Sequence, residues 1–422
     1  MDVNGAIGAL DDWLESMRQP NGYGGPVSHW WQSCFQFTGP GLDWRYEGLL
    51  TGYSQLWQKT GNFRWRNRVF GAASDLIDAQ LPEGNYPNSR FEANPGTLGT
   101  PHEAAASLGL MRSVPVLGPS KIVSAVERNM DYLISQLWDE ETGGFNDRPG
   151  VPGRVPNKLA TLAEGLLLGA QITGRSKWLT LAQSALDDVL QLQVSKGPLR
   201  GGVHQWGRGR HRRGDGRFFP YYNARCIPAL VQGAITFERS QYREAADSIG
   251  DFLERVRNAD GTWPQLIYES GRRVEYPHWV AASADILHAY WVLGRKFPEG
   301  ALERLYHGQL ASGGFITAEG FRRRFDSRAN REAVDIYDLV PVVGWNDKVL
   351  RLLTEIQQNP MPMPSREPLT IACTRRIFVG HHSGRYLETR DRMSIVLDNG
   401  RVVFDWMKGE PWSRTEGEVL VR

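Results

Sequence analysis

The stretch Ser312-Gly-Gly-Phe-Ile316 decides the fold, because five related glycine-aromatic stretches precede it along the chain. They are Asn21-Gly-Tyr-Gly-Gly25, Glu83-Gly-Asn-Tyr-Pro87, Thr142-Gly-Gly-Phe-Asn146, Gly201-Gly-Val-His-Gln-Trp206 and Asp260-Gly-Thr-Trp-Pro264. Their spacing of about 55–65 residues is long for one helix pair of a solenoid and suits two helices joined by a long loop. The sequence therefore predicts one helical hairpin repeated six times.

Two kinds of helical segment alternate with these stretches. Amphipathic segments lead into them and are expected to form outer helices, at Ser120–Trp138, Ser176–Val194 and Gln241–Asn258. More apolar segments rich in alanine and glycine follow and are expected to form inner helices, at Trp44–Lys59, Pro101–Met111, Pro156–Thr173, Pro220–Phe237, Pro277–Leu293 and Glu332–Pro341. Four of the inner segments begin with proline, which suits the first helical turn because no amide donor is needed there. If the helices alternate in direction, the long loops and the inner-helix N-termini share one end, which is the expected functional face.

The predicted fold is all-α, an (α/α)6 toroid of six helical hairpins with a small C-terminal β appendage. Strands are expected at Leu369–Val379, Met393–Leu397 and Arg401–Trp406, with a hairpin turn at Asn399-Gly400. The alternating prolines after Asn359 predict a linker. The expected division is a toroid over 1–358, a Pro-rich linker over 359–368 and a β-rich unit over 369–422.

Composition bounds the class of protein. The chain has 422 residues, 41% of them hydrophobic and 23% charged, and a net charge of +2, which indicates a globular protein without a global attraction to nucleic acid. Neither a signal peptide nor a transmembrane segment is evident, so a cytoplasmic protein without membrane insertion is expected. The three cysteines are far apart and the histidines lack ligand spacing, so neither a metal nor another cofactor is predicted.

Six hairpins with glycine-aromatic loops resemble the α/α-toroid superfamilies, over about residues 5–345. These superfamilies are the six-hairpin glycosidases, the toroidal polysaccharide lyases and the terpene-cyclase and prenyltransferase group. The chain has no DxDD acid, only Asp11-Asp12 and Asp187-Asp188 on outer helices, and no cysteine pattern for a prenyltransferase zinc site. The carbohydrate-active members are thus the better match, and the resemblance implies a cleft at the inner-helix N-termini.

Hydrolysis of a glycoside needs two carboxyl groups, one protonated and one ionised. The candidates on the expected face are Asp43, Glu47, Glu103, Asp335 and Asp338. The competing structural interpretation is that Asp43 caps its helix and Glu47 pairs with an arginine.

A uronate lyase needs instead a base, an acid and a group that neutralises the sugar carboxylate. Residues of the required types occur at successive inner-helix starts: His102, Asn157, Tyr221, Tyr222, Asn223, Arg225 and His278. Tyr222, His278 and His102 are the candidates for proton transfer. The alternatives are a capping role for the histidines and a packing role for the tyrosines.

Aromatic and basic side chains on the same face indicate a ligand. Trp30, Trp31, Trp44, Trp206 and Trp279 are expected to stack on sugar rings, whereas aromatic residues directly after glycine, such as Tyr86 and Phe145, are expected to plug the loops. Dense arginines, with Arg212 and Arg213 in the fourth repeat and Arg323 in the sixth, favour an acidic ligand over a merely solvated loop.

The leading hypothesis is a glycoside hydrolase or uronate lyase acting on an acidic oligosaccharide or polysaccharide in the toroid funnel. The alternatives are a terpenoid- or prenyl-handling toroid enzyme and a non-catalytic glycan-binding toroid.

Overall fold

The computed structural model describes residues 2–29, 34–38, 40–87, 100–207, 214–324, 334–358, 373–379 and 382–410. The protein is mainly helical and carries several small sheets. The expected linker over 359–368 lies outside the described residues, so the division of the chain into domains stays a prediction.

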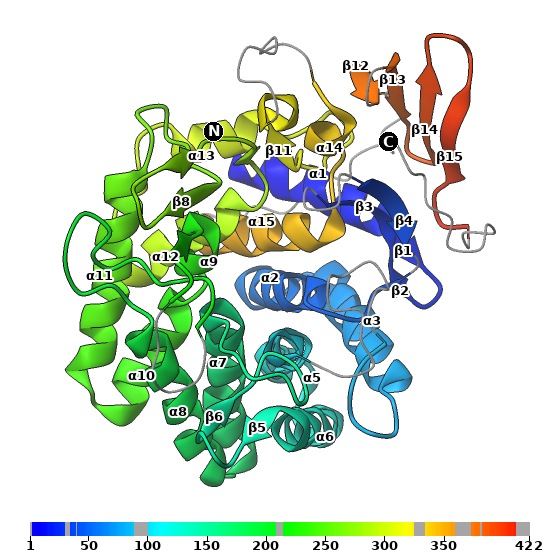
Figure 1. Cartoon of the computed structure of the whole chain (residues 1–422). Coiled ribbons are helices and arrows are strands. Elements are labelled where there is room, and N and C mark those ends of the chain that lie inside the picture. The colour runs from blue at the N-terminus through cyan, green and yellow to red at the C-terminus, as the bar shows by residue number, and fades with distance from the viewer. Residues whose placement is uncertain are drawn as a thin grey trace.

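Six helices lie toward the middle of the molecule, and each packs against two others of the set (Figure 1). They are α2 (Arg45–Thr60), α4 (Ala104–Arg112), α7 (Pro156–Thr173), α10 (Ile227–Phe237), α12 (Ser283–Leu293) and α15 (Val343–Ile356). Their contacts run in chain order from α2 to α15, and α15 packs against α2 again. The order of contacts is therefore closed.

A second set of helices lies outside the first. Its members are α1 (Val3–Ser16), α3 (Phe63–Ala79), α6 (Ser120–Leu137), α8 (Lys177–Gln191), α11 (Ser240–Val256) and α13 (Ala301–His307). The sequence placed α6, α8 and α11 within two residues at their start and three at their end.

A repeated glutamine ties these outer helices together. The Gln80 side chain donates to the carbonyl of Gly84 at 2.9 Å and to that of Ala125, in α6, at 2.8 Å. Equivalent bonds run from Gln193 to Gly201 and Ala245, in α11, at 3.1 and 2.9 Å. Gln309 repeats the pattern and bonds Gly313 at 2.9 Å and Ala6, in α1, at 3.0 Å. The last of these joins the segment after α13 to α1, near the start of the chain.

Close approach of backbones explains the glycines of the repeated stretches. Gly313 has φ +99°, and a Cβ there would stand 1.9 Å from the carbonyl oxygen of Ala9 in α1. Gly201 has φ +86°, and its Cβ would stand 2.0 Å from the carbonyl oxygen of Ser248 in α11. Only glycine combines this φ with such contact. Phe315 next to this site is fully buried, and the aromatic residues expected to be plugs, such as Tyr86 and Phe145, are buried as well.

Two expected inner helices begin elsewhere than the sequence predicted. The start at Pro277 is wrong, because Pro277, which follows a cis peptide bond, leads into strand β10 (His278–Trp279). This strand pairs with β11 (Ala318–Glu319), and α12 begins only at Ser283. In the described part of Glu332–Pro341 the chain forms only the four-residue α14 (Ile336–Leu339). The long sixth helix is α15, which follows Pro341.

Shorter elements lie in the connections between these helices. The short helices are η1 (Pro101–Glu103), α5 (Val114–Leu117), α9 (Pro220–Ala224) and η2 (Phe321–Arg324). The short strands are β1 (Arg18–Gln19), β2 (Gly22–Tyr23), β3 (Gly25–His29), β4 (Cys34–Thr38), β5 (Trp138–Asp139), β6 (Gly144–Phe145), β7 (Arg217–Phe218), β8 (Leu266–Tyr268) and β9 (Arg273–Val274). Most of them pair as two-stranded ribbons.

The C-terminal segment forms a four-stranded antiparallel sheet (Figure 1). Its strands are β12 (Cys373–Val379), β13 (His382–Glu388), β14 (Arg392–Leu397) and β15 (Val402–Met407), and β13 was not foreseen from the sequence. Buried Glu388 fastens the sheet to α1, because it accepts from the Trp13 indole at 3.1 Å and pairs with Lys408 at 2.7 Å. A second attachment is the bridge between Asp335 and Phe378.

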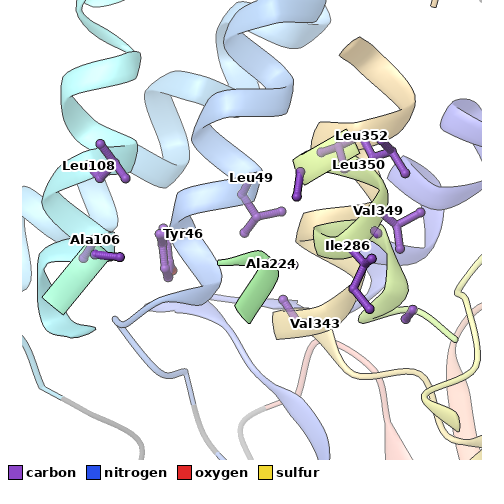
Figure 2. Close-up of a cluster of buried hydrophobic side chains, with 14 of the residues drawn as sticks. Tyr46, Leu49, Ala106, Leu108, Ala224, Ile286, Val343, Val349, Leu350 and Leu352 are labelled. Atoms are coloured by element: carbon purple, nitrogen blue, oxygen red, sulfur yellow. The ribbon is translucent and has the colours of Figure 1, made fainter. Parts of the chain in front are cut away.

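A continuous hydrophobic core fills the space between inner helices. Figure 2 shows Leu49 of α2, Ile286 of α12 and Val349 of α15 gathered in one cluster. All three are at most 3% exposed. Burying side chains of this kind stabilises a fold by roughly 1.5–3 kcal/mol each. Among the described residues, no helix is both long and apolar enough to span a membrane.

Candidate functional site

Five aromatic side chains and a histidine meet where the inner helices begin. We call them the mouth cluster: Trp44, His102, Tyr221, Tyr222, Trp279 and Trp345. Trp345 lies at its centre, with ring centroids 5.3 Å from Trp44, 5.3 Å from Tyr221 and 5.4 Å from Trp279. All six side chains are half-buried, so they retain surface that a ligand can touch.

The cluster gathers side chains from five segments of the chain. Trp44 precedes α2, His102 lies in η1, Trp279 lies in β10, and both tyrosines lie in α9. These five residues were predicted from the sequence, whereas Trp345, in the first turn of α15, was not. A signal was present, because Pro341 precedes α15 by two residues, much as prolines mark α7 and α9.

Six charged side chains lie one helical turn further in, and we call them the buried charge cluster. They are Glu47, Arg225, Asp285, Asp347, Lys348 and Arg351, each at most 8% exposed. Glu47 and Lys348 follow Trp44 and Trp345 by three positions, which places them on the same helical faces. Lys348 also donates to the Trp44 carbonyl at 3.0 Å and lies 5.6 Å from the Trp44 ring centroid. The mouth cluster and the buried charge cluster are therefore in direct contact.

Glu47 is the hub of the buried charge cluster. Its carboxylate accepts from Arg225 at 2.8 Å, from Lys348 at 2.9 Å and from Arg351 at 2.9 Å. Burial alone would raise the pKa of Glu47, but these three cations hold it well below its ordinary value. Asp285 pairs with Arg351 and lies 3.5 Å from Arg225. Glu47 is thus ionised and fully engaged.

Asp43 is engaged as well. Both of its carboxylate oxygens accept from the Arg45 guanidinium, each at 2.8 Å, and one also accepts from the Arg45 amide at 3.1 Å. Against the effect of burial, Arg45 lowers the pKa of Asp43. Asp43 and Glu47 therefore have the contacts of the ion-pair interpretation rather than those of an acid and base waiting for substrate.

His102 and His278 have different neighbours. Burial, with Arg225 and Lys158 nearby, lowers the pKa of His102 to about 3, and its ring lies 6.1 Å from that of Trp44. His102 is therefore a neutral imidazole at the mouth. His278 points to the other side of β10 from Trp279. It stacks on Tyr276 at 4.5 Å, and burial lowers its pKa to about 4.

Arg323 joins His278 instead of the mouth cluster. Its guanidinium lies 4.1 Å from the Tyr276 ring centroid and donates to the Tyr276 hydroxyl. Arg323 and His278 therefore contact the same tyrosine, away from the contacts of His102.

Several other predicted residues hold loops. Asn223 uses its amide to bond Val203 in both directions, at 2.6 and 3.1 Å, and Asn346 bonds Phe315 in the same way, at 2.7 and 3.0 Å. Trp206 packs against Gly153, where a Cβ would come within 2.6 Å of the indole nitrogen. These contacts indicate a loop-fastening role for Asn223 and Trp206.

Other candidates lie at the edge of the site or beyond the description. Glu103 and Asn157 sit beside the mouth, in η1 and in the first turn of α7. Trp30, Trp31, Arg212 and Arg213 fall outside the described residues.

Asp335 and Asp338 form a separate buried carboxyl pair. Asp335 caps α14, and Asp338 accepts from the amide of Phe321 at 2.9 Å and from that of Gly320 at 3.2 Å. Burial raises the pKa of Asp335 to about 6 and, with Asp335 beside it, that of Asp338 to about 8. Asp335 thus holds the start of α14, and Asp338 holds the backbone at the start of η2. In the described part of the chain, no three His, Cys, Asp or Glu side chains come together as a metal site would require.

Comparisons with known proteins show a fold shared with sugar-acting enzymes. No family model and no curated relative matches the sequence. Among solved structures, a D-mannose isomerase matches with a TM-score of 0.63 at 12% identity, over 83% of this chain and 96% of the other. Cellobiose 2-epimerase from Bacillus thermoamylovorans matches with 0.63 at 11%, over 84% and 98%. An unsaturated glucuronyl hydrolase specific for heparin matches with 0.61 at 12%, over 84% and 96%. The chain shares the fold of these six-hairpin glycosidase-like enzymes.

Proposed function

We propose that the chain is an (α/α)6 toroid and a carbohydrate-active enzyme that transfers protons on an acidic saccharide at the mouth cluster. The closed contact order of the inner helices and the bond from Gln309, two residues after α13, to Ala6 in α1 support the toroid. The proposed reaction is of the uronate-lyase type.

The observation that carries the proposal is the difference between the candidate carboxylates, which are ion-paired, and the candidate histidine, which is neutral. Asp43 and Glu47, the two carboxylates nearest the mouth on α2, are bound by arginine and lysine. Hydrolysis by this pair would require at least one of them to give up its cations. His102, in contrast, presents a neutral imidazole among half-buried aromatic rings. A neutral imidazole can accept a proton, so the geometry favours proton abstraction.

Charge around His102 supports an acidic substrate. Arg225, Lys158 and Lys348 all act to lower the pKa of this histidine, while Glu47 alone among its strongest neighbours acts to raise it. A substrate carboxylate placed beside these cations would offset them and raise the pKa of His102. The histidine would then become a stronger base only with an acidic saccharide in place.

The elimination assigns a role to each side chain. His102 takes the proton on the carbon next to the sugar carboxylate, and the electron pair left behind forms a carbon–carbon double bond. The glycosidic oxygen departs from the neighbouring carbon with a proton from the Tyr222 hydroxyl. Lys158, whose charge acts on His102 and which pairs with Asp147 at 2.7 Å, would exchange that partner for the substrate carboxylate. Trp44, Trp279 and Trp345 offer ring faces for the C–H faces of sugars.

The charged groups at the mouth also distinguish this proposal from the alternative functions. A terpenoid site would be lined by apolar groups, whereas cations and a histidine border this mouth. An isomerase and an epimerase share the fold, so an epimerised product is the second outcome to be measured.

The test is turnover of uronate-containing and neutral glycans. Ultraviolet absorbance reports the unsaturated product, reducing-end assays report cleavage, and NMR reports epimerisation. His102→Gln and Tyr222→Phe should each lower kcat by about 10²–10⁴-fold, the usual contribution of a general base or acid. His307→Gln, an exposed histidine on α13, is the matched control and should leave kcat unchanged. Reducing ends without an unsaturated product, or full activity of both variants, would overturn the lyase assignment.

A further inference from the structure

The C-terminal sheet presents two arginines side by side on its outer face. Arg376 of β12 and Arg385 of β13 are direct register partners, and both are exposed. Together with Thr374 and Asp398 they line a hollow in the surface. The opposite face of the sheet is apolar, with Tyr386 and Ile377 fully buried. One face of the sheet is thus buried against the rest of the protein, and the other face is exposed to solvent.

The charges of this hollow are not balanced. Asp398 lies 3.2 Å from Arg376, and within the described residues Arg385 has no ion-pair partner. Like charges directly opposite each other destabilise an antiparallel pair. The two guanidiniums and one carboxylate leave one net positive charge, which a single anionic group would offset.

We propose that this hollow, formed by Thr374, Arg376, Arg385 and Asp398, binds a carboxylate or sulfate group of an acidic polysaccharide. Two neighbouring guanidiniums offer paired N–H donors that match the oxygens of such a group. The Thr374 hydroxyl on the same face adds a further donor. The site is separate from the mouth cluster and does not depend on catalysis there.

The extent of the charge favours a saccharide over other polyanions. A nucleic acid presents a phosphate every few ångströms and is held by a track of cations. The next arginine along the sheet, Arg392, already pairs with Asp405. Anionic membranes call for clusters of about four to eight basic residues. A hollow with one net positive charge suits a polymer that carries one acidic group per sugar.

Binding here would hold a polymer next to the ring. Glu388 and Trp13 connect the sheet to α1, and α1 contacts α15, which carries Trp345. A polysaccharide held by the sheet is therefore kept on the molecule that carries the mouth cluster, which raises its effective concentration there.

The test compares two double variants of the full chain. R376Q/R385Q removes the paired arginines, and R392Q/R401Q removes the same charge from two exposed arginines that do not line the hollow. Polygalacturonate binding is measured by affinity electrophoresis and calorimetry at low and moderate salt. R376Q/R385Q should weaken binding at least tenfold, whereas R392Q/R401Q should change it less than twofold. Circular dichroism establishes that both variants are folded.

Each outcome decides the proposal. Equal weakening by the two double variants would mean unspecific charge attraction and overturn it, as would tighter binding of the native chain to anionic vesicles or duplex DNA. Absence of polygalacturonate binding by the native chain overturns it as well. Turnover of a short acidic substrate should be unchanged in R376Q/R385Q, so failure of the proposed reaction and failure of this site are read separately.

Discussion

Replacing Glu47 with glutamine distinguishes a structural hub from a catalytic carboxylate. The change preserves shape and removes one negative charge from the middle of the buried charge cluster. Three buried cations then face only the two remaining carboxylates of the cluster. We expect a strongly destabilised protein.

The magnitude follows from burial. Removing one partner of a buried ion pair costs about 3–5 kcal/mol, because the other charge stays buried without compensation. Glu47 is fully buried and serves three cations, so the upper part of that range is expected. The matched control is Glu127→Gln, whose partner Arg175 is 40% exposed. An exposed pair contributes about 0.2–1 kcal/mol.

The pH dependence gives an independent reading of the same change. The folded-state pKa of Glu47 lies well below its ordinary value of 4.5. Its contribution to stability is therefore present above pH 4.5 and is lost as the pH falls through the folded pKa. The Glu47→Gln protein should lose less stability than the native protein between pH 5 and about 3.

The assay is urea unfolding followed by circular dichroism, at neutral pH and along the acid side. The reasoning is refuted if Glu47→Gln unfolds within about 0.5 kcal/mol of the native protein, the usual scatter of surface substitutions. Loss of turnover in such a stable variant would instead make Glu47 a catalytic group.

Substitutions at three further positions test the fold. Gly313→Ala should unfold the protein at markedly lower denaturant, since its Cβ meets the backbone of Ala9, whereas Gly271→Ala, with φ +82° and open space around it, should cost only about 1–2 kcal/mol; similar losses in both would contradict the close contact. Asp338→Asn should flatten the pH dependence of stability: a folded pKa of about 8, above the ordinary 3.8, means that native stability falls as the pH rises from about 4 to 8. Stability curves measured across that range check this, and a native protein without the decline would contradict it.

The repeat was predictable because its causes are local. A glycine that must approach a backbone and an aromatic plug behind it recur in sequence, as at Gly201 and Gly313. Proline at a helix start is equally local, and it placed α7 correctly. The same rule failed at Pro277, because a short strand pair with Ala318–Glu319 delays the helix to Ser283. Nothing near Pro277 in the sequence encodes that pairing.

The partners in the site were not predictable, because they are distant in sequence. Glu47 meets Arg225 across 178 positions and Arg351 across 304. A single sequence predicts on which face of a helix each residue lies. It does not predict which helical faces contact one another in the folded protein. Trp345 shows the same difficulty, since its importance comes from contacts with three other segments of the chain.

The reaction assigned to the site depends on these contacts between residues that are distant in sequence. From the sequence, a carboxylate at an inner-helix start looks like a glycosidase acid or base, and Asp43 and Glu47 satisfy that pattern. Once the inner helices pack against one another, α2, α12 and α15 bring charged side chains into a region with little water, where every carboxylate needs a cation. Asp43 and Glu47 are therefore held in ion pairs once the protein folds. Chemistry at the mouth then falls to groups that need no counter-charge when neutral, and His102 is such a group.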